Sequence, residues 1–153
     1  MGMFFKRKPG LVPNYKSEWL RRLQLKFAKY VFWIAGAWGL MVLTPLYFLY
    51  DSIGRMTPPA LTHPEFFYGF AGVAMVWQFA FIVIGSDPAR FRPMMIPAVL
   101  EKAGYVLTLT VLCLQDRISP AQALPAVPDG VLGVLFAIAY FKTGARTASA
   151  AGR

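Results

Sequence analysis

The chain has 153 residues, of which 57% are hydrophobic, 16% aromatic and only 15% charged. A soluble protein of this size could not bury so much apolar surface, so the composition indicates a membrane protein. The net charge of +9 would suggest nucleic-acid binding in a soluble protein. Eight of the sixteen Lys and Arg residues, however, precede the first apolar run. We therefore expect them at a membrane surface and expect no nucleic-acid partner.

Residues 1–30 form a basic segment that we expect to be cytoplasmic or interfacial. Within it, from Ser17 to Tyr30, apolar residues recur at helical spacing between basic ones. This pattern predicts an amphipathic helix that lies along the lipid headgroups. Its cations either only orient the first span or bind anionic lipid or a partner protein; they are Arg21, Arg22, Lys26 and Lys29.

Four apolar segments follow, each near the length of about 20 residues that crosses a hydrocarbon core of roughly 30 Å. They cover residues 31–50, 66–85, 95–115 and 124–141. The fourth is the weakest, because its uninterrupted apolar run is only Val131 to Phe141, and a re-entrant or interfacial segment is the alternative. We predict an all-α fold in which an integral membrane four-helix bundle occupies residues 31–142.

Two features concern the outer side of this bundle. Pro45 lies within the first span and should kink its helix near the outer third. The outer loops, Asp51 to Glu65 and Asp116 to about Asp129, are rich in proline and should be stiff connectors.

Lys and Arg residues are distributed unevenly among the connecting segments. The two loops after the first and third spans contain only Arg55 and Arg117, whereas most other basic residues lie before the first span, between the second and third, and in the tail 143–153. Because positive residues are retained in the cytoplasm, we expect both termini and the middle loop to be cytoplasmic.

The middle loop contains Asp87 at a helix N-cap position and Pro88 at the first helical position. This pair predicts a single helical turn that presents Arg90 and Arg92. The arginines either hold the loop inside or bind an anionic lipid headgroup. Alternatively, one of them pairs with Glu101.

Glu101 is an ionisable residue inside the third span, where a charge costs roughly 2.5 kcal/mol or more. Counting residues from the ends of the spans puts Gln78 and Trp38 at a similar depth. On a helical wheel, Tyr105 and Thr108 share the face of Glu101, and Lys102 is turned away so that it can reach the cytoplasmic surface.

These positions predict an intramembrane polar cluster of Glu101, Gln78, Trp38, Tyr105 and Thr108. The second and third spans should face each other through Gln78 and Glu101. The cluster either fixes the register of the bundle, or supplies a carboxylate that binds a proton or a ligand, or lets Glu101 reach the interface.

The inventory of reactive residues argues against an enzyme. His63 is the only histidine and Cys113 the only cysteine, so the chain alone offers no disulfide, no thiolate metal site and no paired imidazoles. The sequence shows no nucleophile with a base and no paired carboxylates at one depth. We expect neither a metal nor a cofactor.

The run from Asp87 to Met95, followed by Leu100, Glu101 and Lys102, resembles a pattern in small bacterial four-span membrane proteins that are loosely similar to DoxX-like proteins. The resemblance implies a multi-pass protein of the bacterial inner membrane with no catalytic residues to transfer. We expect a non-enzymatic accessory or interaction subunit, or a binder of a small apolar ligand. Its expected partners are membrane lipids and either further copies of the chain in a homo-oligomer or the subunits of a larger membrane complex. The alternative is a small proton-coupled transporter or channel that uses Glu101.

Overall fold

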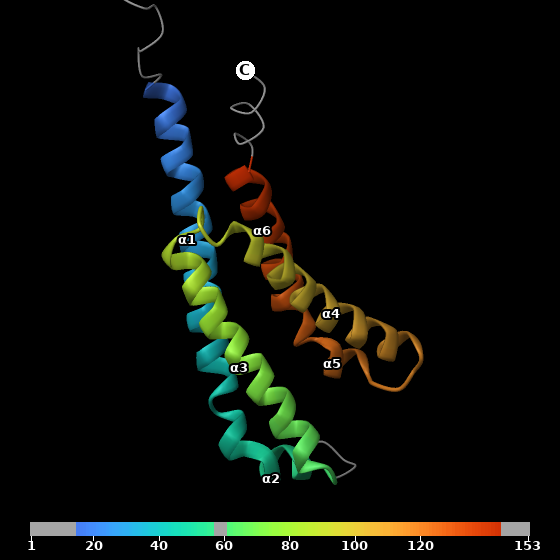
Figure 1. The fold of residues 1–153 in the computed structure, drawn as a ribbon. Coiled ribbons are helices and arrows are strands. Elements are labelled where there is room, and N and C mark those ends of the chain that lie inside the picture. The colour runs from blue at the N-terminus through green and yellow to red at the C-terminus, as the bar shows by residue number, and fades with distance from the viewer. Residues whose placement is uncertain (1–14, 57–60, 145–153) are drawn as a thin grey trace, which may run out of the picture.

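The computed structural model describes residues 15–56 and 61–144 (Figure 1). Four of its helices in this part of the chain are long and apolar enough to cross a membrane. The long helices are α1 (Tyr15–Leu43), α3 (Pro64–Ser86), α4 (Met95–Leu114) and α6 (Ala126–Gly144), and the short ones are α2 (Leu46–Met56), η1 (Arg92–Met94) and α5 (Pro120–Ala123). The prediction of an all-α fold is confirmed for the described residues, and the four long apolar helices support the predicted multi-pass membrane protein. Predictions that concern residues 1–14, 57–60 and 145–153 lie outside the described residues.

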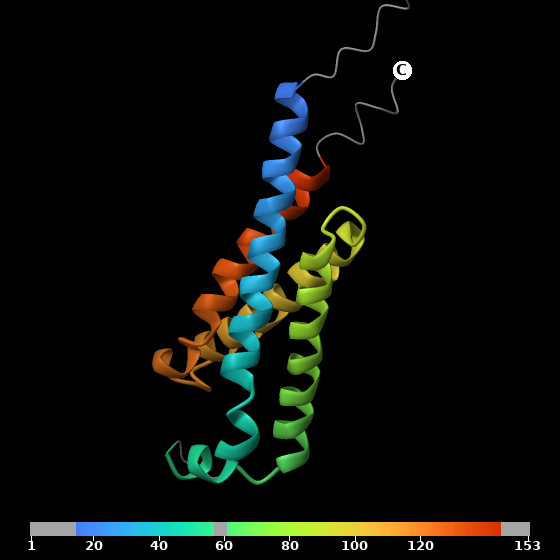
Figure 2. The same cartoon turned by 90° about the vertical axis from the view of Figure 1, so that its left-hand side faces the viewer.

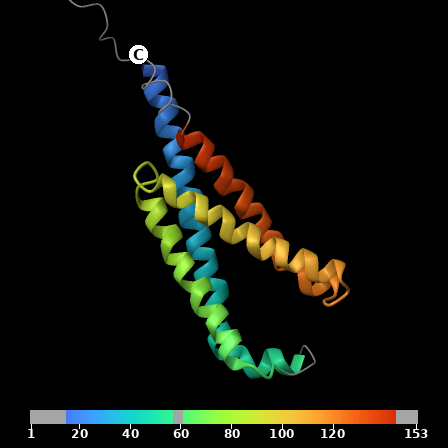
Figure 3. The ribbon, with the colours of Figure 1, turned by 45° about the vertical axis from the view of Figure 1, so that its right-hand side comes forward.

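The helices form two antiparallel pairs. α1 packs along α3 and α4 packs along α6, and the two pairs meet where α1 contacts α6. By contrast, α3 and α4 are consecutive in the chain but contact each other little. They diverge away from their connection, as Figures 1 and 3 show. The backbones of α3 and α4 are therefore farther apart than those of the two packed pairs, and aromatic side chains such as Tyr105 and Phe70 lie between them.

The first predicted span differs from the observed helix at both ends. The segment from Ser17 to Tyr30 is helical, as predicted, but it continues without a break into the span as part of α1. At the other end the helix stops at Leu43 and does not merely kink at Pro45. Proline lacks a backbone N–H and its ring clashes with the preceding turn, so the helical hydrogen bonds of α1 cannot continue through Pro45. Here the Thr44 hydroxyl donates a hydrogen bond to the carbonyl of Leu40, at 2.6 Å.

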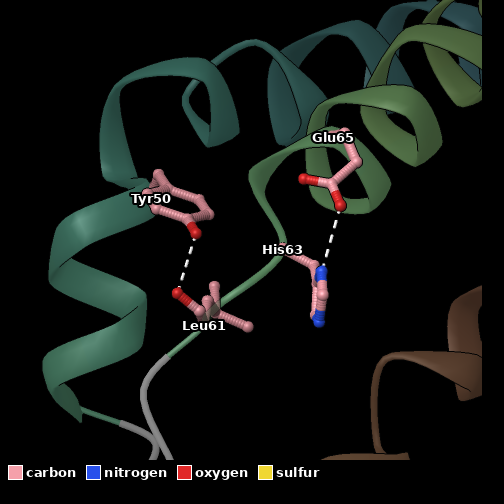
Figure 4. A network of polar contacts seen from close by, with 4 residues as sticks. All are labelled: Tyr50, Leu61, His63 and Glu65. Carbon is pink, nitrogen blue, oxygen red and sulfur yellow. Dashed lines mark hydrogen bonds and ion pairs between the residues drawn. The ribbon is translucent and has the colours of Figure 1, made fainter.

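The predicted outer loop after this span is partly helical, because α2 includes Asp51 to Met56. Figure 4 shows how the described end of the loop is held beside it: the Tyr50 hydroxyl donates to the carbonyl of Leu61, at 2.8 Å. Next along the chain, His63 Nδ1 lies 3.0 Å from Glu65 Oε1. These contacts fix the entry into α3 at the outer end of the molecule.

Aromatic rings fill the centre, where three helices meet. Phe32 of α1 stacks on Phe136 of α6 with ring centroids 4.2 Å apart, and Phe81 of α3 meets Phe136 edge-on at 4.9 Å. All three rings are fully buried. Small residues around them let the helices approach closely; they are Ala28, Ala35, Ala98 and Ala139.

Glycines of α1 allow its close contact with α3. A Cβ on Gly36 would lie 2.7 Å from Ile82 Cγ1 and 2.8 Å from the backbone oxygen of Gln78. A Cβ on Gly39 would overlap the Gln78 side chain. At Gly36 the backbone of α1 therefore lies close to the backbone of α3, and at Gly39 it lies against the Gln78 side chain.

This contact predicts opposite effects for two Gly→Ala substitutions. Gly36→Ala places a methyl group against the α3 backbone, and overpacking costs about 1–3 kcal/mol. Gly69→Ala introduces a Cβ with nothing within 4 Å, so only the helix-propensity gain of up to about 1 kcal/mol applies. We expect thermal unfolding in detergent to show a lower melting temperature for Gly36→Ala than for Gly69→Ala. Equal melting temperatures would contradict the close contact.

Candidate functional site

Three ionisable side chains, two from α4 and one from α6, lie close together where these two helices pack. The Nζ of Lys102 lies 3.0 Å from Asp129 Oδ1 on α6 and 3.3 Å from Glu101 Oε2 on α4. Lys102 is only 4% exposed, and the side chains of both carboxylic acids are mostly buried. We call Glu101, Lys102 and Asp129 the ion cluster.

The backbone explains how Lys102 reaches this position. It lies seven residues after Met95, and Met95, Ala98 and Lys102 are the buried residues of α4 at intervals of three and four. On α6, Gly133 lies against the Cβ of Lys102 and Gly130 lies near Val106. Because Gly133 has no side chain, the lysine stem passes close to α6 and its ammonium group arrives beside Asp129.

The apolar surroundings of the ion cluster strengthen its electrostatic interactions. The Lys102 ammonium lies 5.2 Å from the centroid of the Phe81 ring, a cation–π contact from α3. Lys102 is seven residues, or about 10 Å along the helix axis, from the start of α4, so its backbone lies well inside the span. Charges at such depth must be paired, because hydrocarbon does not solvate them.

The structure corrects three predictions about this site. Lys102 does not extend toward the cytoplasmic surface but is buried. The helices α3 and α4 do not face each other through Gln78 and Glu101, since Glu101 pairs with Lys102 and α4 packs on α6. Two carboxylates do occur at one depth, because Glu101 and Asp129 share Lys102.

Gln78 has a separate environment from Glu101. It is only 3% exposed, and its Nε2 donates a hydrogen bond to the carbonyl of Ala74 one turn earlier in α3, at 2.9 Å. Its side chain fills the space that Gly39 leaves on α1. This residue therefore supports the contact between α1 and α3.

The other members of the predicted polar cluster are also dispersed. Trp38 is 46% exposed on the surface of α1. Tyr105 stacks on Phe70 of α3 with ring centroids 6.0 Å apart, and Thr108 is exposed on α4. The structure thus keeps Glu101 in a polar cluster but gives it different partners.

The connection between α3 and α4 has the predicted helical turn. Asp87 Oδ1 accepts a hydrogen bond from the backbone N–H of Arg90, at 3.1 Å, which confirms the predicted cap. Arg90 itself is exposed. Arg92 lies over the Tyr140 ring, 4.0 Å from its centroid, and its Nε donates to the Tyr140 carbonyl at 3.3 Å. Arg92 therefore joins the connection to α6 and is not the partner of Glu101.

The basic residues of α1 remain near one end of the molecule. Those that the sequence predicts to bind lipid or a partner are largely accessible: Arg21, Arg22 and Lys26 are exposed. Lys29 is half-buried, with its Nζ 4.3 Å from the centroid of the Trp33 ring. Lys142 of α6 lies over the ring of Phe27 of α1 and adds a positive charge at this end of the molecule.

Lys102 and Asp129 are the two site residues that the sequence interpretation missed. Asp129 falls both at the end of the predicted outer loop and inside the predicted fourth span, 124–141, and the sequence gives it no role; in the structure it lies in the first turn of α6. Gly130 and Gly133 were the signal that could have revealed the site, because spaced glycines mark a face on which another helix packs.

The described residues contain no group of three or more His, Cys, Asp or Glu side chains that could hold a metal ion. The ion cluster can instead fix the position of α4 on α6 or exchange a proton at a carboxylate. No protein-family model, curated protein or solved structure matches the chain.

Removing the lysine tests how strongly the ion cluster holds the fold. Lys102→Met leaves buried carboxylates without their cation, and breaking a buried ion pair in this way costs about 3–5 kcal/mol. We expect a corresponding loss of unfolding free energy in bicelles, whereas Lys26→Met on the exposed surface should leave it unchanged. The triple variant Glu101→Gln, Lys102→Met, Asp129→Asn should recover most of the loss. Wild-type stability of the single Lys102 variant would show that the ion cluster does not hold α4 on α6.

Proposed function

We propose that the chain is a non-enzymatic membrane subunit that assembles with a transmembrane helix of another membrane protein. The proposal rests on a stripe of small and polar residues on a face of α4 that does not pack on α6. Gly104 and Thr108, four residues apart on α4, are both exposed, and a Cβ on Gly104 would meet nothing within 4 Å.

Such a stripe is unfavourable on a surface that contacts only lipid. A glycine inside a helix costs up to about 1 kcal/mol relative to alanine, and the stripe has no apolar packing to offset that cost. In lipid, small residues four positions apart let a second helix approach closely, and hydroxyl groups bond across the interface. The spacing of Gly104 and Thr108 fits this arrangement.

The place of the stripe in the bundle also supports a partner helix. The adjacent residue, Tyr105, reaches toward α3 and stacks on Phe70, so the stripe lies next to the α3-facing side of α4. A helix that packs on the stripe would lie beside α4 and near α3. Our proposal is therefore an interaction subunit whose bundle is completed by its partner.

For the location we propose a bacterial inner membrane, with both ends of the chain in the cytoplasm and basic residues against anionic headgroups. The beginning of α1 and the end of α6 lie at the same end of the molecule (Figure 2). Arg21, Arg22 and Arg90 are exposed. Positive residues are the ones that cytoplasmic segments retain.

Reporter fusions test this orientation. A reporter that is active only in the cytoplasm, fused to either end of the chain, should give a signal in both fusions. The same reporter inserted next to Arg117, in the connection between α4 and α5, should give none. Signals from opposite sides for the two ends would contradict the even number of crossings.

Substitutions in the stripe test the assembly. Gly104→Leu with Thr108→Leu adds bulk to the exposed face of α4 without touching the ion cluster. We expect proteins that copurify with the wild-type chain from native membranes to be lost, while the melting temperature of the isolated chain does not fall, because removing a glycine from an unpacked helix face raises helix propensity. Ala37→Leu is the matched control, because Ala37 is also a small exposed residue within a span, on α1. Unchanged copurification with the stripe variant would refute this interface.

A further inference from the structure

We propose that the ion cluster is a proton-binding site in which Glu101 carries one proton. The cluster then consists of a neutral Glu101, a positive Lys102 and a negative Asp129. This inference goes beyond the proposed function and does not depend on it, because it concerns the isolated chain and needs no partner helix.

The positive and negative charges of the ion cluster do not balance when all three groups are ionised. One ammonium group contacts two carboxyl groups, at 3.0 Å and 3.3 Å, so the fully ionised cluster has a net charge of −1. A net charge inside hydrocarbon is costly, and a buried group that cannot be compensated becomes neutral. Binding a single proton removes the imbalance.

No other charged group among the described residues compensates the cluster. On the packed faces, α4 contributes Lys102 and Tyr105, α6 contributes Asp129, and α3 contributes the ring of Phe81. At the α1–α6 contact, α1 contributes Phe32. The cation of η1, Arg92, is held by Tyr140, and α5 contains no titratable residue.

Lys102 must keep its proton. Loss of that proton would leave two carboxylates with no cation and would raise the net charge from −1 to −2. The Phe81 ring also favours the cationic form, since its face attracts an ammonium group. The added proton therefore belongs on a carboxyl group.

Two observations assign the proton to Glu101. Asp129 lies in the first turn of α6, where the helix dipole stabilises a negative charge, and it is the closer partner of Lys102. Glu101 lies well inside α4 and lacks that support. Its Oε2 is buried and, among the described residues, has no partner with hydrogen-bond geometry. An ionised oxygen would be poorly solvated there, so it is the better site for a new O–H bond.

The chemistry is a simple proton transfer. A hydronium ion gives its proton to a carboxylate oxygen of Glu101: an O–H bond of the hydronium ion breaks, the O–H bond of the acid forms, and water is released. The product is a carboxylic acid, which differs from a carboxylate in its carbonyl stretching vibration. Infrared spectroscopy of the wild-type chain in lipid can therefore detect the bound proton directly.

Isotope labelling decides which residue carries it. The chain has three glutamates, of which Glu18 and Glu65 are exposed. At neutral pH we expect the carbonyl band of one protonated carboxylic acid. Labelling the side-chain carboxyl carbon of glutamate with ¹³C should shift this band, and the same label in aspartate should leave it in place. No band at neutral pH, or a shift with labelled aspartate, would overturn the proposal.

Three variants complete the experiment. Glu101→Gln should abolish the band, and Glu65→Gln, which removes an exposed glutamate, should retain it. Asp129→Asn should also abolish it, because Glu101 and Lys102 then form a neutral pair without an added proton. A band that persists in Asp129→Asn would show that charge balance is not the cause. Should a variant not fold, the labelled wild-type chain still decides the assignment.

Discussion

An ammonium group in hydrocarbon requires a counter-charge, and this requirement determines what α4 packs against. Lys102 lies on the face of α4 that Met95 and Ala98 also occupy, and it finds its counter-charge in Asp129 on α6. The pairing of α4 with α6 follows from this contact and from Gly133, which makes room for the lysine stem. Because α4 has only one such face, it cannot pack on α3 in the same way. The ion cluster thus explains both why α4 packs on α6 and why it contacts α3 little.

The other helix pair depends on a different interaction. Gly36 and Gly39 bring the backbone of α1 against α3, and no ion pair links them in the described part of the chain. In lipid, such close backbone contact and the packing it permits are sources of helix association. The three phenylalanines connect this pair to α6. Transport of an ion through this fold would require further helices to enclose a path, because α3 and α4 diverge.

Much of the fold could be predicted from the sequence, because span positions depend only on length and apolar composition. The predicted second and third spans agree with α3 and α4 to within two residues at each end. The partners of each helix could not be predicted in this way. A helical wheel gives the faces of one helix but does not say which neighbour each face meets. Similar depth assigned Glu101 to Gln78, and the helical wheel, which turns Lys102 away from Glu101, directed the lysine toward water.

The site was therefore predicted in part. The cost of a carboxylate in a membrane span identified Glu101 as a polar residue that needs a partner, and Lys102 provides one. Asp129 was missed because it lies at the outer end of the predicted fourth span, and the sequence does not show that this end packs against the middle of α4. The helical turn at Asp87 was predicted correctly because capping depends on neighbouring residues alone.

The unbroken course of α1 determines where its positive charges can be. A helix of 29 residues is about 43 Å long at about 1.5 Å per residue, roughly 13 Å more than the hydrocarbon core. With its apolar part in the bilayer, the helix holds the basic turns rigidly upright above the surface, and only a tilt of the entire rod could lay them flat. With the apolar part ending at Leu43, Arg21 and Arg22 stand less than about 5 Å beyond the hydrocarbon core, at the depth of the phosphates, whereas the first turn of the helix extends farther into water. The attraction of these arginines to the membrane should fade as ionic strength rises.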